Sequence, residues 1–284
     1  MRHTQREDIE PPMATLNKRQ TLGSLRYLVV DMDGVLYRGT TAIPGTREFL
    51  AFLREQGIGF VLATNNATRT PQQFVAKLAG MGVEVFPSEI LTSAQATAGY
   101  LAGVAPRGTR VFVVGMDGLC SALRDAGFEL VEDDPEYVVA GMEFTISCER
   151  LAQASLHIRA GAAFVGTNPD LTFPSERGMV PGAGSLLALL EAATGVKPRV
   201  IGKPETSMME QAMARMGATA ATTAVLGDRL DTDILAGQRA GLCTLLVLSG
   251  VTDRPSLAHA EIQPDFVFED VADLTATWKK VFRE

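Results

Sequence analysis

Short apolar runs alternate with amphipathic segments over most of this chain, from about residue 25 onward. Each run is bounded by glycine, proline or polar residues, which is typical of buried β-strands. The segments between the runs carry apolar residues at helical spacing, and several of them end in a glycine, as helices often do. The predicted strands are residues 25–31, 57–66, 110–115, 136–142, 162–168, 199–203, 222–228 and 243–249. This order of strands and helices predicts an α/β protein with a mainly parallel sheet.

Four of the predicted strands deliver a polar residue at their carboxyl end, namely Asp31, Thr64, Lys203 and Asp228. In a doubly wound sheet, ligands bind outside the carboxyl ends of the strands, at the point where the strand order reverses. We therefore expect a Rossmann-like, doubly wound parallel-sheet core in which these four side chains converge on one site.

The strands predicted between residues 110 and 168 have no acidic residue at their ends, and glycine and proline cluster on either side of this region. This difference predicts that a second domain is inserted between two halves of the core. We expect the core to comprise residues 25–103 and 198–284, and the inserted domain to comprise residues 104–197.

Residues 1–24 are polar, contain the pair Pro11 and Pro12 and show no sustained periodicity, so they predict a flexible extension. Met13 lies within this stretch and is an alternative start of the chain. The extension has mixed charges and no apolar segment of the kind that a signal peptide needs, so we expect a cytoplasmic protein.

The composition excludes several classes of function. The chain carries 33 Asp and Glu residues against 26 Lys and Arg residues, for a net charge of -7. No basic cluster could neutralise several phosphates, and no apolar run approaches the roughly 18 residues of a membrane span, so neither nucleic acid nor a membrane is an expected partner. The 3 cysteines and 3 histidines lie far apart, which excludes a disulfide framework and a His-rich metal site. Any catalysis is therefore expected to depend on carboxylates.

The segment LVVDMDGVLYRG (28–39) places Asp31 and Asp33 two residues apart where an apolar run ends. On a bending loop this spacing lets both carboxylates face one site, and Gly34 lets backbone amides approach an anion closely. An ordinary turn with two aspartates is the alternative for such a motif by itself. The apolar residues on both sides favour a site.

The segment ATNNATRT (63–70) offers groups of the kind that bind phosphate. Thr64 supplies a hydroxyl, and Asn65 and Asn66 supply amides, where a predicted strand ends. An Asx-type turn with a capping threonine is the alternative.

Lys203 comes directly before a proline at the end of a predicted strand, in VIGKPET. At such a place an ammonium group can face carboxylate and phosphate, although most lysines are simply solvated. The segment is not a P-loop, because the glycine-rich arc that precedes the lysine of a P-loop is missing.

The segment VLGDRLDTD (225–233) carries Asp228, Asp231 and Asp233 at a predicted strand-to-helix turn. Three close carboxylates repel one another unless a cation joins them, so the cluster predicts a site for a hard metal ion. Helix capping explains one or two aspartates at such a place more easily than three. Asp231 is the weakest candidate, because it can face solvent at the start of the helix.

Together these groups suit phosphoryl transfer, which needs in-line geometry and neutralisation of the charge on the transferring group. The ordered set DMDGV, TNN, GKP and GDRLDTD resembles the motifs of the haloacid dehalogenase superfamily of phosphatases. Residues 25–284 are similar to its NagD-like or p-nitrophenylphosphatase subfamily, which includes phosphoglycolate and pyridoxal phosphate phosphatases, and residues 166–198 resemble that subfamily's α/β cap. The resemblance implies a Mg²⁺-dependent hydrolase of small phosphomonoesters, such as sugar phosphates, phosphoglycolate, nucleotides or aryl phosphates.

The resemblance also implies a role for each motif residue. Asp31 would form an aspartyl phosphate, and Asp33 would protonate the leaving oxygen and then activate water. Mg²⁺ would be held by Asp31, the backbone carbonyl of Asp33 and Asp228, with support from Asp233. The residues expected to bind phosphate are Gly34, Thr64, Asn65, Asn66 and Lys203.

The loop TNPDLTFP (167–174) matches the segment that reaches over the core site in relatives with this cap. We expect Asn168, Asp170 and Phe173 to contact the organic part of a small phosphorylated metabolite, with an ordinary turn as the alternative. Pyridoxal phosphate phosphatases have a histidine where Phe173 stands, so broad specificity is the expectation. Relatives often pair through the cap, which suggests a homodimer by analogy.

Two other functions compete with a phosphatase. A dehalogenase-type hydrolase uses a comparable aspartate, but it needs neither Asp33 nor the carboxylates from Asp228 to Asp233. A phospho-aspartate regulatory module would be phosphorylated on Asp31 and signal, but Asp33 and the large cap favour turnover.

Overall fold

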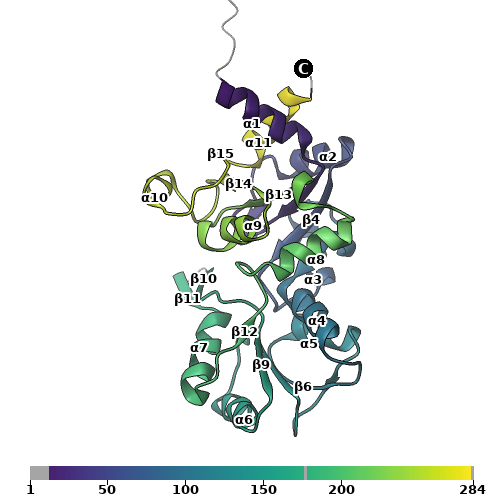
Figure 1. Cartoon of the computed structure of the whole chain (residues 1–284), viewed down its shortest axis with the longest axis vertical. Coiled ribbons are helices and arrows are strands. Elements are labelled where there is room, and N and C mark those ends of the chain that lie inside the picture. Colours follow the sequence, from purple (N-terminus) through teal and green to yellow (C-terminus); the bar gives the residue numbers. More distant parts are fainter. Residues whose placement is uncertain (1–12, 176–177, 283–284) are drawn as a thin grey trace, which may run out of the picture.

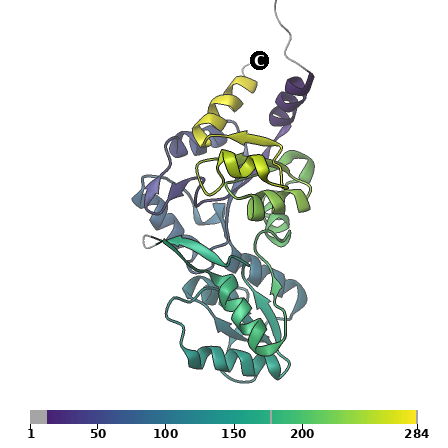
Figure 2. The same ribbon diagram turned by 90° about the vertical axis from the view of Figure 1, so that its left-hand side faces the viewer.

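The computed structural model describes residues 13–175 and 178–282, which form two lobes, one above the other in Figures 1 and 2. The upper lobe contains a sheet with the strand order β15 (Phe266–Phe268), β14 (Cys243–Val247), β13 (Thr223–Gly227), β1 (Tyr27–Val30), β4 (Gly59–Thr64) and β5 (Ile90–Thr92). The lower lobe contains a sheet with the strand order β12 (Arg199–Val200), β9 (Ala163–Gly166), β8 (Tyr137–Ala140), β6 (Arg110–Val114) and β7 (Glu129–Leu130). We call the upper lobe the core and the lower lobe the cap.

Every strand pair within these two sheets is parallel. The helices of the core are α1 (Met13–Ser24), α2 (Thr46–Glu55), α3 (Pro71–Gly80), α4 (Ser93–Val104), α8 (Ser207–Met216), α9 (Leu235–Arg239), α10 (Arg254–His259) and α11 (Val271–Val281). The helices of the cap are α5 (Asp117–Asp125), α6 (Cys148–Arg159) and α7 (Ala183–Thr194). The predicted α/β fold with a doubly wound parallel core is therefore confirmed. Within the described residues, no helix has the length and apolar character that crossing a membrane requires.

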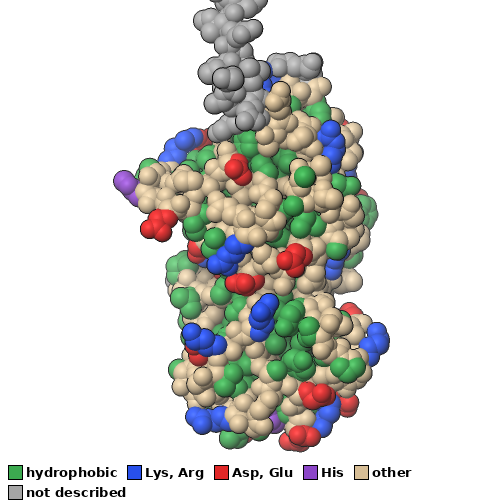
Figure 3. Space-filling view, viewed as in Figure 1, with side chains coloured by type: hydrophobic (Ala, Val, Ile, Leu, Met, Phe, Trp, Pro, Cys, Tyr) green, Lys and Arg blue, Asp and Glu red, His purple; other side chains and the backbone are tan. Residues whose placement is uncertain are grey.

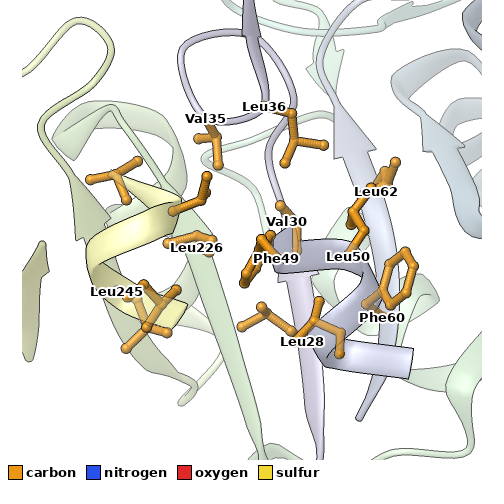
Figure 4. Packing of buried hydrophobic residues seen from close by; sticks show 14 of the residues in the cluster. Leu28, Val30, Val35, Leu36, Phe49, Leu50, Phe60, Leu62, Leu226 and Leu245 are labelled. Carbon is orange, nitrogen blue, oxygen red and sulfur yellow. The ribbon is translucent and has the colours of Figure 1, made fainter. Parts of the chain in front are cut away.

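Both faces of the central strand β1 are buried. Leu28 and Val30 belong to an apolar cluster on one face of the sheet, and Val29 belongs to a cluster on the other face. Figure 4 shows the first face, where Phe49 and Leu50 of α2 pack beside Leu28 and Val30. Successive side chains of a strand point to opposite faces, so a strand covered on both sides needs a continuous apolar run. This explains why the sequence YLVV marks the strand without alternation.

Shorter elements complete the two lobes. The hairpin of β2 (Tyr37–Arg38) and β3 (Thr41–Ala42) follows β1 in the core, and the hairpin of β10 (Thr172–Ser175) and β11 (Gly178–Pro181) projects from the cap. Two 3₁₀ turns lie at Pro87–Glu89 and Ala220–Thr222, and a π-helical turn lies at Leu230–Ile234.

The cap extends slightly beyond the predicted boundary at residue 198. Arg199 and Val200 pair with β9 in the cap sheet, so the chain returns to the core after them. The predicted strand 199–203 is also shorter than expected, and Lys203 lies outside it. A short apolar run indicates a strand but does not show which of two sheets the strand joins.

Residues 13–24 form the helix α1, which corrects the expectation of a flexible extension, while residues 1–12 lie outside the described part of the chain. Leu22 and Leu25 are buried, and the indole Nε1 of Trp278 donates a hydrogen bond to the carbonyl oxygen of Leu22 over 2.9 Å. Figure 1 shows α1 beside the C-terminal helix α11. The contacts that order this segment come from the other end of the chain, so local periodicity could not reveal them.

Candidate active site

Three neighbouring strands of the core sheet, β13, β1 and β4, each deliver a predicted site residue at their carboxyl ends. Asp228 directly follows β13, Asp31 directly follows β1, and Thr64 is the last residue of β4. The chain runs from β1 to β4 on one side and later returns to β13 on the other side of β1. This is the switch point at which such sheets bind ligands.

Three carboxylates meet at this edge. Asp31, Asp228 and Asp233 each offer an oxygen atom, and these atoms lie within 4.8 Å of one another. We call these residues the aspartate trio. Asp231 is not among them, because its side chain accepts two hydrogen bonds from Arg229, over 3.1 and 2.8 Å. These hydrogen bonds lower the pKa of Asp231, whose side chain is largely exposed.

Lys203 is the buried cation of the site. Its Nζ contacts Asp31 Oδ1, and it donates to Asp233 Oδ1 over 2.6 Å and to the carbonyl oxygen of Ala63 over 3.0 Å. An ammonium group has three donors, so all of them are used. Burial by itself would lower the pKa of Lys203, but Asp233 and Asp31 raise it above its ordinary value. The lysine is therefore charged at neutral pH.

The aspartate trio carries more negative charge than Lys203 neutralises. Burial, followed by the charge of Asp233, raises the pKa of Asp228 to about 7. Burial also raises the pKa of Asp31 well above its ordinary value, although Lys203 opposes this shift. With all three carboxylates ionised, two negative charges remain unbalanced. Oxygen donors with this charge fit a hard divalent cation such as Mg²⁺.

Two glycines make room for the Asp228 carboxylate. A Cβ atom at Gly34 would lie 2.3 Å from Asp228 Oδ2, and one at Gly250 would lie 1.9 Å from it. Gly34 also has a φ of 86°, a left-handed conformation that favours glycine. The N–H of Val251 donates to the same oxygen over 2.6 Å. The sequence indicated Gly34 but not Gly250, whose one signal is its position just after β14, the strand beside β13.

Asp233 reaches the site because the chain takes a wide, underwound turn after β13. The π-helical turn Leu230–Ile234 carries it inward, and the N–H of Arg229 donates to Asp233 Oδ2 over 3.2 Å. Gly227 permits this approach, since a Cβ atom there would lie 2.1 Å from the Cβ of Asp233. π-Helical turns are rare and frequently mark functional sites.

Asp33 lies apart from the aspartate trio, and its carboxylate is not one of the three grouped oxygens. The residue is exposed, yet partial burial of its carboxyl raises its pKa, an effect that Lys77 of α3 partly opposes. A carboxyl group with a raised pKa can hold a proton closer to neutral pH, as a general acid must. The predicted metal contact through the backbone carbonyl of Asp33 stays a prediction.

The asparagines after β4 have protein partners for their side chains. Asn65 Oδ1 accepts from the N–H of Lys203 over 2.8 Å, and Asn65 Nδ2 donates to the carbonyl oxygen of Lys203 over 2.9 Å and to Asp170 Oδ2 over 3.1 Å. Asn66 Oδ1 accepts from the N–H of Thr68 over 2.9 Å and from its hydroxyl over 2.7 Å. Asn66 thus forms the Asx turn that was the alternative for this motif. In the structure the side-chain amide of Asn65 forms hydrogen bonds with Lys203 and Asp170. The sequence led us to expect a contact between this amide and phosphate.

The cap residues singled out in the sequence separate into two groups. Asn168 and Asp170 reach the core, where Asn168 Nδ2 donates to the carbonyl oxygen of Asn65 over 2.8 Å. Phe173 lies on the β10–β11 hairpin instead, with its ring 5.9 Å from that of Phe144. Figure 3 shows side chains of both charges at the boundary between the lobes.

The chain matches two family models. One is described as haloacid dehalogenase-like hydrolase and covers residues 28–129, and the other is described as HAD-hydrolase-like and covers residues 200–274. The chain is also 38% identical over 253 residues to the acid sugar phosphatase of Staphylococcus aureus, across 89% of this chain and 97% of that protein.

Three solved structures have a similar fold. The 4-nitrophenylphosphatase of Thermotoga maritima has a TM-score of 0.87 at 36% identity, over 90% of this chain and 98% of that chain. The glycerol phosphate phosphatase of Mycobacterium tuberculosis, in complex with magnesium, has a TM-score of 0.84 at 37% identity, over 91% and 79% of the two chains. NagD from Escherichia coli K-12 has a TM-score of 0.82 at 36% identity, over 88% and 98%. Each similarity extends over both lobes.

Proposed function

This chain belongs to the haloacid dehalogenase-like hydrolase family as a NagD-like phosphatase, and we propose that it hydrolyses small phosphomonoesters, sugar phosphates among them, with Mg²⁺ and through an aspartyl-phosphate intermediate. The observation that supports this most is the contact of Asp31 with the buried ammonium of Lys203 inside the aspartate trio. An aspartate that contacts a charged lysine at the switch point of the sheet is placed to act as a nucleophile.

Asp31 and Asp33 divide the chemistry between them. A carboxylate oxygen of Asp31 attacks the phosphorus atom, the bond to the leaving oxygen breaks, and Asp33 gives its proton to that oxygen. Asp33, now ionised, takes a proton from a water molecule, whose oxygen attacks the phosphorus of the aspartyl phosphate. Phosphate leaves and both aspartates return to their starting states. Proton transfer of this kind contributes typically 10² to 10⁴-fold in rate.

The other residues of the site neutralise and hold the phosphate. Lys203 offsets the charge of the transferring group, and the hydroxyl of Thr64 donates to a phosphate oxygen. Asp31, Asp228 and Asp233 would hold Mg²⁺, which when bound supplies positive charge next to the transferring phosphate. The glycines at 34 and 250 keep Cβ atoms away from Asp228 and so leave room for it to serve as a ligand.

The names of the relatives guide the choice of substrates. One relative is called an acid sugar phosphatase, and similar structures are called 4-nitrophenylphosphatase and glycerol phosphate phosphatase. These leaving groups share little beyond small size. We therefore propose a broad substrate range that includes sugar phosphates and glycerol phosphate.

The test is phosphate release from p-nitrophenyl phosphate, glycerol phosphate and a hexose phosphate, measured with Mg²⁺ and with EDTA. We expect the wild-type protein to turn over these substrates with Mg²⁺ and to lose activity with EDTA. We expect Asp31→Asn and Asp33→Asn to lose activity even with Mg²⁺. Asp231→Asn is the matched control, since this carboxylate belongs to the same motif but pairs with Arg229, and it should keep most of the activity. Acid quench of the wild-type protein should also trap a phosphoprotein that Asp31→Asn does not form. Hydrolysis retained by Asp31→Asn would contradict the mechanism.

A further inference from the structure

The cap loop that follows β9, residues 167–170, is seated directly on the core. The N–H of Gly202 donates to the carbonyl oxygen of Thr167 over 2.9 Å, and Asn168 Nδ2 donates to the carbonyl oxygen of Asn65 over 2.8 Å. No side chain fits at Gly202, since a Cβ atom there would lie 2.6 Å from Thr167 O and 2.7 Å from Asn65 Oδ1. The backbone of the loop therefore lies in direct contact with the backbone of the core at Gly202.

The Asn65 side chain links this loop to Lys203. Its amide pairs with both backbone polar groups of Lys203, over 2.8 and 2.9 Å, and its remaining hydrogen goes to Asp170 Oδ2 over 3.1 Å. A carboxylate accepts hydrogen bonds and does not donate them, so Asp170 favours the amide with Nδ2 toward the cap. If the amide turned by half a rotation, Asn65 Oδ1 would face the carboxylate and Nδ2 would face the N–H of Lys203. All three hydrogen bonds would be lost.

Asp170 is itself held in place. Arg229 Nη1 lies 3.8 Å from its second oxygen, Oδ1, which is buried and has no hydrogen-bond partner among the described residues. The N–H of Asp170 donates to Asn168 Oδ1 over 3.2 Å. The carboxylate is thus fixed by the loop on one side and by a core arginine on the other.

The far end of Lys203 leaves little tolerance for movement of its backbone. Its three ammonium hydrogens are all used, on Asp31, Asp233 and the carbonyl oxygen of Ala63. The side chain spans the distance between this head and the backbone that Asn65 holds. A shift of that backbone therefore changes how the ammonium meets the nucleophile.

We infer that Asp170 is a positioning residue: its carboxylate holds the Asn65 amide, that amide holds the backbone of Lys203, and the seated cap loop thereby fixes the lysine against Asp31. The inference rests on the proposed function, in which Lys203 serves phosphoryl transfer. It gives Asp170 a role that does not involve contact with the substrate. Displacement of a catalytic group by about 1 Å can cost about 10²-fold in rate.

The experiment measures kcat and KM for p-nitrophenyl phosphate and for a hexose phosphate at saturating Mg²⁺. Asp170→Ala should lower kcat by about 10- to 100-fold for both substrates and leave KM within about threefold. Asp170→Asn keeps a carbonyl oxygen that can accept from Asn65, so it should restore most of kcat. Asp231→Asn, which removes the other carboxylate partner of Arg229, should leave kcat near that of the wild type.

A double variant separates positioning from other roles. In an Asn65→Ala background, Asp170→Ala should lower kcat little further, because its effect passes through Asn65. Additive losses, or a KM change that differs between the two leaving groups, would overturn the inference in favour of substrate contact. A wild-type kcat in Asp170→Ala would overturn it as well. If Asp170→Ala does not fold, Asp170→Leu keeps the branched shape at Cγ without an acceptor and takes its place. Failure of the proposed function would show differently, as a wild-type protein without Mg²⁺-dependent phosphate release.

Discussion

The core sheet and the cap sheet bring their carboxyl ends to the same place but present different chemistry there. The core strands β1 and β13 are followed directly by Asp31 and Asp228, which are acidic and buried or nearly so. The cap strands β6 and β8 are followed directly by Gly115 and Gly141, where a Cβ atom would lie 2.8 Å from Leu119 and 2.8 Å from Thr167. Two parallel sheets of the same architecture thus serve different purposes. Charge is concentrated on one edge, and the other edge is built for close contact.

Replacing Lys203 by methionine should have the largest effect, because it removes the cation from the charged edge. Loss of one partner of a buried ion pair costs about 3–5 kcal/mol, and loss of the charge that faces the phosphate should lower kcat about 10³-fold. Urea unfolding and steady-state kinetics measure the two losses. Lys197→Met, at an exposed lysine after α7, should change stability by less than about 0.5 kcal/mol. Near-wild-type activity in Lys203→Met would contradict the idea that the core edge differs from the cap edge by the charges it needs for catalysis.

Gly250→Ala tests whether close packing at the core edge serves the metal site. The new Cβ atom would lie 1.9 Å from Asp228 Oδ2 and must displace the carboxylate. We expect the Mg²⁺ concentration for half-maximal activity to rise about 10- to 100-fold, as when groups that orient metal ligands are lost. Titration of activity with Mg²⁺ measures the change. Gly103→Ala, whose Cβ atom would meet nothing within 4 Å, should leave the titration unchanged.

Gly202→Ala makes the corresponding change where the cap meets the core. Its Cβ atom would push against Thr167 O and the Asn65 amide, so it should unseat the cap loop rather than move the aspartate trio. We expect kcat to fall about 10-fold, with the Mg²⁺ titration unchanged. The same titration decides the matter: a shift as large as that of Gly250→Ala would mean that both edges serve the metal.

The smallest effect concerns the stability of the metal-free protein. Burial and the charge of Asp233 raise the pKa of Asp228 to about 7, from an unfolded value of about 4. A carboxyl group with a raised pKa stabilises the fold below its unfolded pKa, and this contribution is lost as the pH rises through the folded pKa. With EDTA, Tm should therefore fall on the order of 5 °C between pH 5 and pH 8.

Asp228→Asn provides the control, since it should show a smaller fall in Tm over the same range. Added Mg²⁺ should raise Tm more at pH 8 than at pH 5, because it replaces the proton on the aspartate trio. A Tm that rises with pH in EDTA would contradict the assignment of excess negative charge to the core edge.

The elements that the sequence predicted are those whose signal is local. The apolar runs that became β1, β4, β13 and β14 are buried on both faces and stand out by composition alone. β15 was missed, because its three residues are too short for any periodicity. α1 was missed for another reason, since its end is held by Trp278 from the opposite terminus.

The site divides in the same way. Asp31 and Asp228 were found because each directly follows an apolar strand of the core, and parallel strands end at one edge. Lys203 was found from the apolar run before it, although it lies three residues beyond β12. The partners of Asn65 could not be found, because Lys203 and Asp170 lie 138 and 105 residues further along the chain. In a sequence motif, an asparagine that binds phosphate cannot be told from one that forms hydrogen bonds with the backbone of a lysine. What distinguishes them is a tertiary contact.

The position of β12 sets a rule for exchanging caps between relatives. Arg199 and Val200 are an edge strand of the cap sheet, and Lys203 follows them three residues later on the same stretch of chain. In a chimera joined at residue 198, the cap sheet would come from the donor protein, but its edge strand β12 would come from the recipient. A chimera joined after Lys203 would import the donor's lysine together with the strand that carries it. The edge strand of the cap sheet and the active-site lysine are therefore inherited together at this junction.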